Sequence, residues 1–76
     1  MTITVTNFSA FDHNYDVFDE IANVSVLSGF PMAPNASQVV TIAQNASGYG
    51  RIRFKNEQQG GWTESALISP GEVIQM

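Results

Sequence analysis

The chain has no cysteine, and charged residues make up only 13% of its 76 residues. Without cysteine, no disulfide can stabilise the fold and no thiolate can serve catalysis or metal binding. The three cations are too few for a phosphate-binding surface, which needs clustered lysine and arginine. The net charge of −4 also disfavours adhesion to anionic lipid. We therefore expect neither nucleic acid nor a membrane surface as a partner.

Long hydrophobic runs and helical periodicity are absent as well. No apolar stretch approaches the ~20 residues of a membrane span. The first residues lack the basic start and apolar core of a secretory signal. No window of eleven residues shows the i, i+3, i+4, i+7 spacing of an amphipathic helix, and residues 18–24 are long enough for a single turn at most. Localisation stays open between a cytoplasmic protein and a mature secreted domain with an added start methionine.

What the chain does contain is a series of short strand-like runs. Residues 2–6, Thr-Ile-Thr-Val-Thr, alternate polar and apolar without a fault, as a strand with one wet face does. Breaks rich in Gly, Pro, Asn, Asp and Ser separate the runs, at 7–10, 19–23, 30–36, 44–48, 56–61 and 69–72. The predicted strands span 2–7, 11–18, 24–29, 37–43, 49–55, 62–68 and 72–76. About seven short strands in one chain predict a single all-β domain over residues 1–76, a small antiparallel sandwich or barrel.

Turn chemistry supports this interpretation. Pro70-Gly71 fits the centre of a type II turn, and Gly60-Gly61 closes a longer hairpin loop. In residues 28–43 a glycine ends one predicted strand and a proline-containing loop introduces the next. This connection resembles one common in bacterial Ig-like domains, and the resemblance implies an Ig-like appearance of the fold and no particular function.

Two predicted strands carry complementary charges. Arg51, Arg53 and Lys55 share one side of their strand, because alternate residues of an extended chain share a face. Asp12 and Asp16 likewise share one side of the strand at 11–18. We predict that the two strands are neighbours in one sheet, with acids opposite cations. The alternative is that both faces are independently solvated.

The acidic residues do not form a familiar catalytic or calcium motif. Asp12 and Asp16 would lie ~13 Å apart along a strand, too far for a glycosidase pair. The spacing Asp12-x-Asn14-x-Asp16 matches the start of a calcium loop, but the required glycine and glutamate are missing further on. A non-standard calcium site built from Asp16, Asp19 and Glu20 remains an alternative.

His13 is the only histidine, so zinc would need mainly carboxylate ligands, which is unusual. Ser9 is near it in sequence, but there is no nucleophile elbow and no third member of a triad. We expect His13 to pack on a half-buried face with Phe11 and Tyr15. The sequence thus predicts no enzyme, no catalytic residue, no metal and no cofactor.

Four asparagines are each followed by x-Ser: Asn7, Asn23, Asn35 and Asn45. In a secreted eukaryotic protein these would be glycan acceptors. We interpret them instead as turn residues at strand ends that bond their own backbone.

With catalysis and metal binding not predicted, the function that the sequence favours is non-covalent binding of a ligand or partner. If successive strands run antiparallel, the breaks at 7–10, 30–36 and 56–61 gather at one end, which is rich in aromatic and amide side chains. Such groups suit sugar rings or a protein hot spot. The predicted ligand-binding residues are Phe30, Met32, Asn56, Gln58, Gln59 and Trp62. The structural alternative is that Phe30 and Trp62 plug the end of the core.

We therefore predict a non-enzymatic recognition module for carbohydrate or a protein surface. Two alternatives belong to other classes. The chain could be an assembly protein that forms a homo-oligomer, because a small domain without disulfides often gains stability from itself. It could also be a small acidic inhibitor whose residues from Asp12 to Glu20 meet a basic site.

Overall fold

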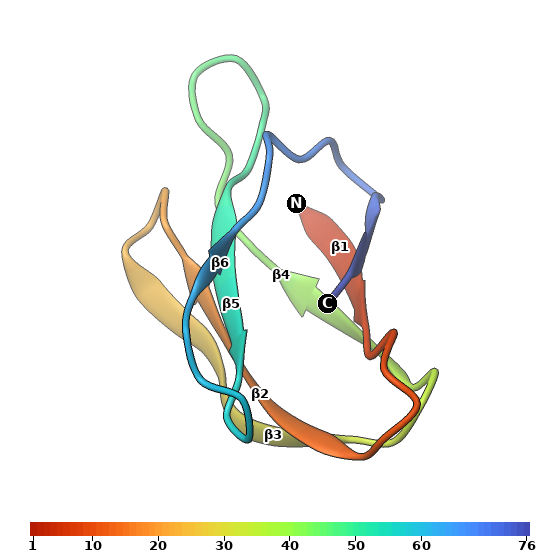
Figure 1. Cartoon of the computed structure of the whole chain (residues 1–76). Helices are drawn as coiled ribbons and strands as arrows, with labels where there is room; N and C mark the ends of the chain where they lie inside the picture. Colours follow the sequence, from red (N-terminus) through yellow and green to blue (C-terminus); the bar gives the residue numbers. More distant parts are fainter.

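Every regular element of this chain is a β-strand, in a computed structural model that describes residues 1–76 (Figure 1). The strands are β1 (Thr2–Thr6), β2 (His13–Asp19), β3 (Val24–Met32), β4 (Ser37–Thr41), β5 (Ile52–Asn56), β6 (Thr63–Glu64) and β7 (Val73–Gln75). The single helical turn that residues 18–24 allowed is a strand end followed by a hydrogen-bonded turn. No helix of a length and apolarity that would cross a bilayer is present. The all-β prediction is confirmed.

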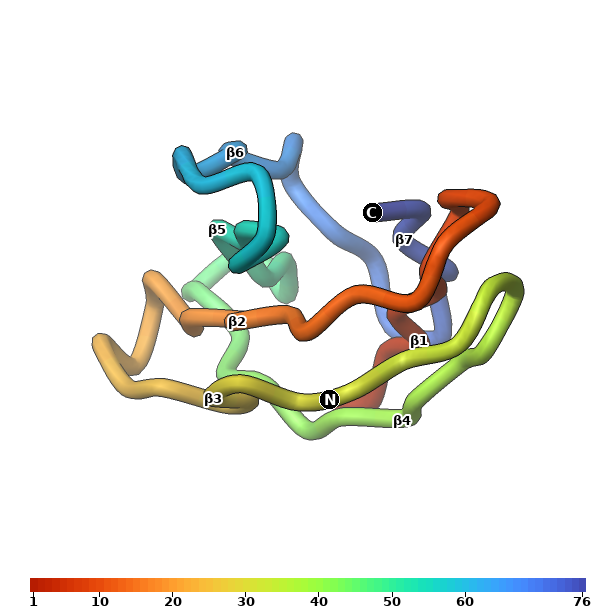
Figure 2. Tube along the Cα trace, turned by 60° about the horizontal axis from the view of Figure 1, so that its bottom comes forward, coloured from red at the N-terminus to blue at the C-terminus, as the bar shows by residue number.

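The strands form two sheets (Figures 1 and 2). Sheet A has the order β4-β1-β7 and sheet B the order β3-β2-β5-β6. All pairs are antiparallel except β1 with β7, which run parallel. The expectation of a purely antiparallel arrangement is therefore wrong at this edge. After β6 the chain crosses from sheet B to sheet A through residues 65–72, so no hairpin joins β7 to β1 and the pair is not constrained to be antiparallel.

The core lies between the two sheets and is aliphatic. Its buried members are Ile3, Val5, Val17, Val40, Ile42, Ile52 and Ile68. The alternation of polar and apolar residues along β1 determines which of its side chains reach the core. Ile3 and Val5 are buried, while Thr2 is exposed. Full burial of each of these side chains contributes about 1.5–3 kcal/mol relative to exposure. Packing of this kind is what holds two sheets together without a disulfide.

The prediction that the acidic and cationic strands are neighbours is confirmed, and one acid lies opposite a cation. β2 and β5 are antiparallel neighbours, with Asp16 opposite Lys55 and Phe18 opposite Arg53. The Lys55 ammonium lies 3.6 Å from the Asp16 carboxylate. Asp12 and Arg51 lie outside the two strands and take no part in the ladder.

Several predicted boundaries are wrong. β3 continues to Met32, whereas the sequence predicts a break from residue 30. Phe30 and Met32 instead pair with Tyr15 and His13 of β2. The register of the β2–β3 ladder shifts near Gly29, whose φ of 58° departs from regular strand geometry. Pro31 is tolerated because β3 is an edge strand, where a missing N–H costs no ladder bond.

The turn assignments hold. Glu72 N donates to Ser69 O across Pro70-Gly71, and Gly71 has a φ of 80°, as a type II turn requires. Residues 57–62 link β5 to β6 as a hairpin.

The four asparagines act in two ways. Asn7 and Asn45 accept hydrogen bonds from the backbone of the serine two residues on, as predicted. Asn23 and Asn35 instead occupy the left-handed region, with φ of 60° and 63°, which asparagine tolerates better than most residues.

The connections alternate between the two ends of the domain, as predicted. In Figure 1 residues 7–12, 33–36 and 57–62 lie at the lower end, and residues 20–23, 42–51 and 65–72 lie at the upper end. The lower end is where the sequence predicts a binding site.

Candidate functional site

A pocket of about 260 Å³ opens at the lower end. One wall comes from the 7–12 connection and the start of β2, and the other from β5 and the β5–β6 loop. The side chains used below are Phe8, Ser9, His13, Asn56 and Gln59, which all line it. The C-terminal residue Met76 lines it too, so three separate parts of the chain meet here.

Buried Asn7 shapes the first wall. Its side-chain amide donates to Phe11 O at 2.9 Å and to Met32 O at 3.0 Å. Its oxygen accepts from Ser9 N and from the Tyr15 hydroxyl, each at 2.9 Å. These bonds determine the path of the 7–12 connection, and Phe8 is left 66% exposed at the pocket. An aromatic ring is thereby presented on a backbone that side-chain bonds hold in place.

Ser9 and His13 form a hydrogen-bonded pair in the same wall. Ser9 Oγ lies 3.0 Å from His13 Nε2 and accepts a bond of 3.1 Å from Phe11 N. His13 Nδ1 is buried and has no partner. A buried N–H without a partner costs more than an unused lone pair, so the imidazole hydrogen belongs on Nε2 and points at Ser9. The Ser9 hydroxyl hydrogen is then free to donate to a ligand.

His13 also packs as predicted. Its ring meets Phe11 and Tyr15 edge-on, with centroid distances of 6.5 and 6.1 Å. No carboxylate reaches its Nδ1 to complete a triad, and no group of three or more His, Cys, Asp and Glu side chains is arranged to hold a metal ion.

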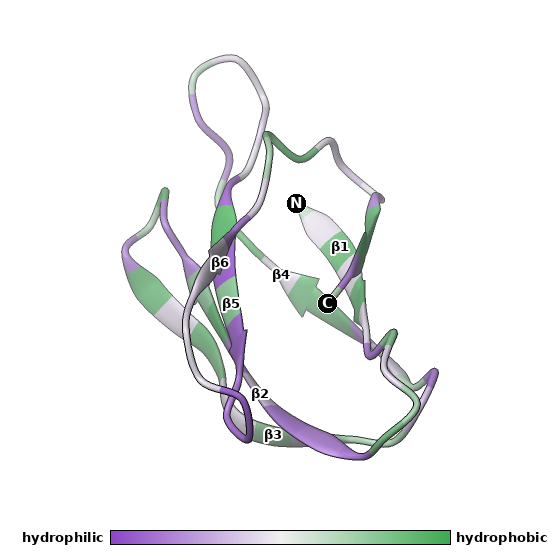
Figure 3. Cartoon of the chain, in the orientation of Figure 1, coloured by the Kyte–Doolittle hydropathy of each residue, from purple (hydrophilic) through white to green (hydrophobic).

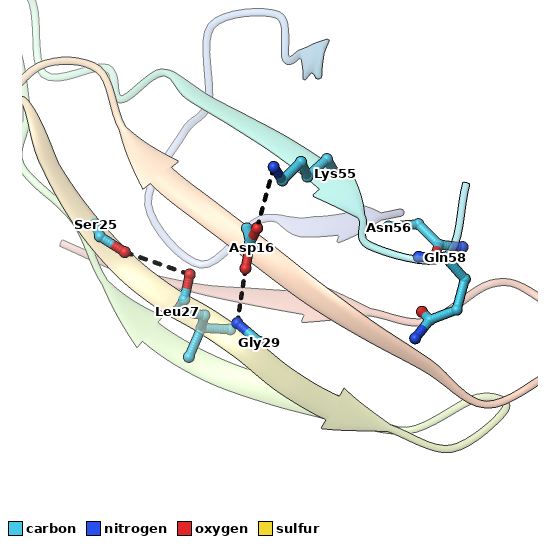
Figure 4. Close-up of polar contacts among 7 residues, drawn as sticks. All are labelled: Asp16, Ser25, Leu27, Gly29, Lys55, Asn56 and Gln58. Carbon is cyan, nitrogen blue, oxygen red and sulfur yellow. Dashed lines mark hydrogen bonds and ion pairs between the residues drawn. The ribbon is translucent and has the colours of Figure 1, made fainter. Parts of the chain in front are cut away.

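The β5–β6 loop shapes the second wall. Glu57 N donates to Asn14 O at 2.8 Å and Gln58 Oε1 accepts from Asn14 N at 2.9 Å, which ties the loop to β2. Gln58 N donates to Asn56 Oδ1 at 2.9 Å (Figure 4 shows both side chains). The Asn56 side-chain NH₂ and the whole Gln59 side-chain amide have no hydrogen-bond partner in the chain, so they remain able to bond a ligand.

The six predicted site residues lie in three places. Asn56 and Gln59 line the pocket, and Gln58 lies in the same loop but is bonded to β2. Phe30 and Met32 face the same side of sheet B as their partners Tyr15 and His13, and Met32 is only 3% exposed.

Trp62 lies on the opposite side of sheet B. Its ring is 4.9 Å from the Arg53 guanidinium and 4.9 Å from the Lys55 ammonium. Arg53 also lies 4.3 Å above the Phe18 ring, so its guanidinium is held between two aromatic rings. The structure therefore does not bring Trp62 together with Phe30 or Met32.

The carboxylates near this face form two pairs. Asp16 Oδ1 accepts a bond of 2.6 Å from Gly29 N (Figure 4), and this bond chiefly lowers the pKa of Asp16. The neighbouring Asp16 carboxylate raises the pKa of Glu57, and the neighbouring Glu64 carboxylate raises the pKa of Glu20.

The predicted acidic patch is not a single surface. Asp12 is exposed, but Asp19 is 2% exposed and accepts bonds from the backbone of Ile21, Ala22 and Ala43. The alternative calcium site is also not formed, because Asp19 faces the interior and Asp16 faces outward.

The predicted ligand-binding residues include Asn56 and Gln59 but omit the other ten of the twelve residues that line the pocket, among them Phe8, Ser9, Thr63 and Met76. Phe8 could have been found, since it lies in a break that the strand pattern assigns to the lower end. Met76 could not, because its position depends on the parallel pairing of β7 with β1.

Comparison with protein-family models, with curated proteins and with solved structures finds no match to this chain.

Proposed function

We propose that this domain is a non-enzymatic recognition module that binds one neutral sugar ring in the pocket at its lower end. The observation that carries the proposal is the meeting of Asn56 and Gln59 with the exposed ring of Phe8 around one pocket. Both amides belong to the site that the sequence predicts.

The chemistry of the lining matches a sugar. Ring hydroxyls donate and accept hydrogen bonds, and the amides of Asn56 and Gln59 and the hydroxyl of Ser9 can do both. The apolar face of a sugar ring can lie against Phe8, as ligands do on aromatic side chains in mixed polar and apolar sites.

Charge and size narrow the ligand further. No aspartate or glutamate side chain lines the pocket, and the ammonium of Lys55, which does line it, is held over Asp16 and Trp62. No unpaired charged side chain of the lining therefore favours an ionised ligand. The volume of about 260 Å³ is just below the ~300–1,000 Å³ of sites for drug-sized molecules, which suits one ring better than a chain.

The proposal excludes hydrolysis. The Ser9–His13 pair is not set up for nucleophilic attack, because the imidazole hydrogen on Nε2 points at Ser9 Oγ, no third group orients the ring, and Phe11 N already donates to Ser9 Oγ. We interpret the pair as a hydrogen-bonding element of the binding wall.

A glycan array tests the proposal, with Phe8→Ala and Phe11→Ala as matched variants. Phe8 is 66% and Phe11 71% exposed, but only Phe8 lines the pocket. We expect the wild type and Phe11→Ala to bind the same glycans, and Phe8→Ala to lose them. Absence of any glycan signal, or equal loss in both variants, would contradict the proposal.

Trp62 favours a second candidate function, recognition of a protein surface. It is 46% exposed and flanked by Arg53 and Lys55, and tryptophan and arginine are enriched in binding hot spots. A partner retained by the domain should be lost with Trp62→Ala and kept with Phe8→Ala, the reverse of the pattern for the sugar pocket.

We further propose that the fold is a small Ig-like β-sandwich. Two sheets around one aliphatic core support it, and so does the connection from β3 to β4, where a proline-containing loop links sheet B to sheet A.

A further inference from the structure

Sheet A carries no charged side chain. All seven acids and all three cations of the chain lie outside β1, β4 and β7. The outward face of this sheet consists of threonine, serine, valine and glutamine, with Val39 61% and Val73 56% exposed. In Figure 3 the purple segments of β2 and β5 contrast with the green and pale colours of most of β4.

β4 is an edge strand whose outer side has unpaired backbone groups. Asn7 N donates to Ala36 O, and Ile42 N donates to Met1 O. Because hydrogen-bonded positions alternate along an antiparallel pair, the even-numbered residues of β4 bond β1. Ser37, Val39 and Thr41 therefore direct their N–H and C=O groups toward the open edge, where Val39 O accepts a bond of 3.1 Å from the side-chain amide of Gln38. β4 pairs with β1 alone and no strand pairs with its other side, and Figure 1 shows β4 diverging from β3 after residues 33–36.

The other three edges are protected against pairing, and β4 is not. β3 has register shifts and contains Pro31, β6 has two residues and ends at Glu64, and β7 has three residues. Irregularity, proline, charge and shortness are the devices that keep edges from pairing. β4 has five residues in unbroken register with β1 and contains neither charge nor proline.

We propose that β4 pairs antiparallel with β4 of a second copy of this chain, about a two-fold axis at Val39. Ser37 then lies opposite Thr41 of the second copy, and the two sheets A become one continuous sheet. The outward N–H and C=O groups of Ser37, Val39 and Thr41 then bond the second copy, and Val39 O exchanges its bond from the exposed Gln38 side chain for one from a backbone N–H. The cross-strand neighbours are Val with Val and Ser with Thr, both favourable pairs.

The distribution of charge favours a second copy as the occupant. The net charge of −4 repels copies that approach through the charged parts of the domain. Sheet A is a surface through which two copies can meet without juxtaposing like charges. A two-fold interface also requires that the same patch serve both subunits, and one uncharged strand does so.

Sedimentation velocity over a concentration series tests this, with Val39→Lys and Val73→Lys as variants. Both residues project from the outward face of sheet A, but only Val39 lies on the β4 edge. We expect a concentration-dependent dimer for the wild type and for Val73→Lys. Val39→Lys should raise the dimer dissociation constant at least about tenfold, because it places like charges opposite each other.

Three results would overturn the proposal: a wild type that stays monomeric at high micromolar concentration, a Val39→Lys variant that dimerises like the wild type, or equal loss in both variants. Equal loss would indicate face-to-face stacking of sheets A instead of edge pairing. If circular dichroism shows that Val39→Lys does not fold, Thr41→Lys places the charge on the same edge at an exposed position. None of these outcomes depends on sugar binding.

Discussion

The Tyr15 hydroxyl donates a hydrogen bond of 2.9 Å to the side-chain oxygen of Asn7, and both residues are buried. Tyr15 belongs to sheet B, and Asn7 directly follows the β1 strand of sheet A. The bond therefore links the two sheets beside the pocket. Three of the groups around Asn7 are backbone carbonyls that accept from its amide, those of Phe11, Met32 and Ala33.

We predict that Asn7→Ala destabilises the domain by about 2–4 kcal/mol, because it leaves the buried carbonyl of Met32 and the Tyr15 hydroxyl without their partner. Tyr15→Phe should cost only about 1–2 kcal/mol, since Asn7 Oδ1 keeps its bond from Ser9 N. Urea unfolding measures both. Equal losses of stability in the two variants would contradict the central role of Asn7. Efficient glycosylation of Asn7 in the folded domain would contradict its burial.

Asp16 should make stability fall on acidification. Its folded pKa is lowered, chiefly by the bond from Gly29 N, so its contribution is present above the unfolded value of about 3.9 and is lost as pH falls through the folded pKa. Asp16→Asn should cost about 1 kcal/mol at neutral pH and nothing in strong acid. Asp12→Asn is the control, because Asp12 is exposed and accepts no hydrogen bond. A cost for Asp16→Asn that does not change with pH would refute this account.

Glu20 should make stability fall as the pH rises, the opposite of the effect of Asp16. Its pKa is raised by Glu64, so it contributes stability below the unfolded value of about 4.3 and loses it as pH rises through the folded pKa. We predict that Glu64→Gln raises the urea midpoint at neutral pH and has no effect near pH 3. Glu72→Gln, in the turn before β7, should be neutral at both pH values. A lower midpoint for Glu64→Gln at pH 7 would show that the charged pair is not repulsive.

Gly50 lies in close contact with its neighbours. A Cβ at this position would lie 2.6 Å from Ile42 Cδ1, 3.0 Å from Met1 Cε and 3.3 Å from Ala43 O. Gly50→Ala should destabilise the domain by about 1–3 kcal/mol. Ile42→Val removes the methyl group that clashes, so the double variant should lose less than the sum of the single variants in denaturant unfolding. If the losses of stability in the two single variants add up in the double variant, the contact with Ile42 Cδ1 is not the cause of the destabilisation.

The fold was predictable to the extent that local patterns determine it. The alternation of Thr2–Thr6, the turn at Pro70-Gly71 and the matched charges of Asp16 and Lys55 each specify a local structure that the coordinates contain. The parallel β7 was not predictable, because its direction depends on a crossover through residues 65–72 that no local signal specifies.

The site was only partly predictable. Asn56 and Gln59 lie at the end of the domain where the sequence predicts them, because strand alternation orders the connections. Whether a side chain at that end points inward or outward depends on register. Met32 pairs with His13 and is buried, whereas Trp62 crosses to the outer face of sheet B.

An NMR titration of the isotope-labelled domain with neutral monosaccharides tests the central claim most directly. The account predicts saturable shifts confined to the pocket, including the side-chain amides of Asn56 and Gln59, with the Trp62 indole unmoved. Shifts centred on Trp62, or no saturable shift with any sugar, would contradict it.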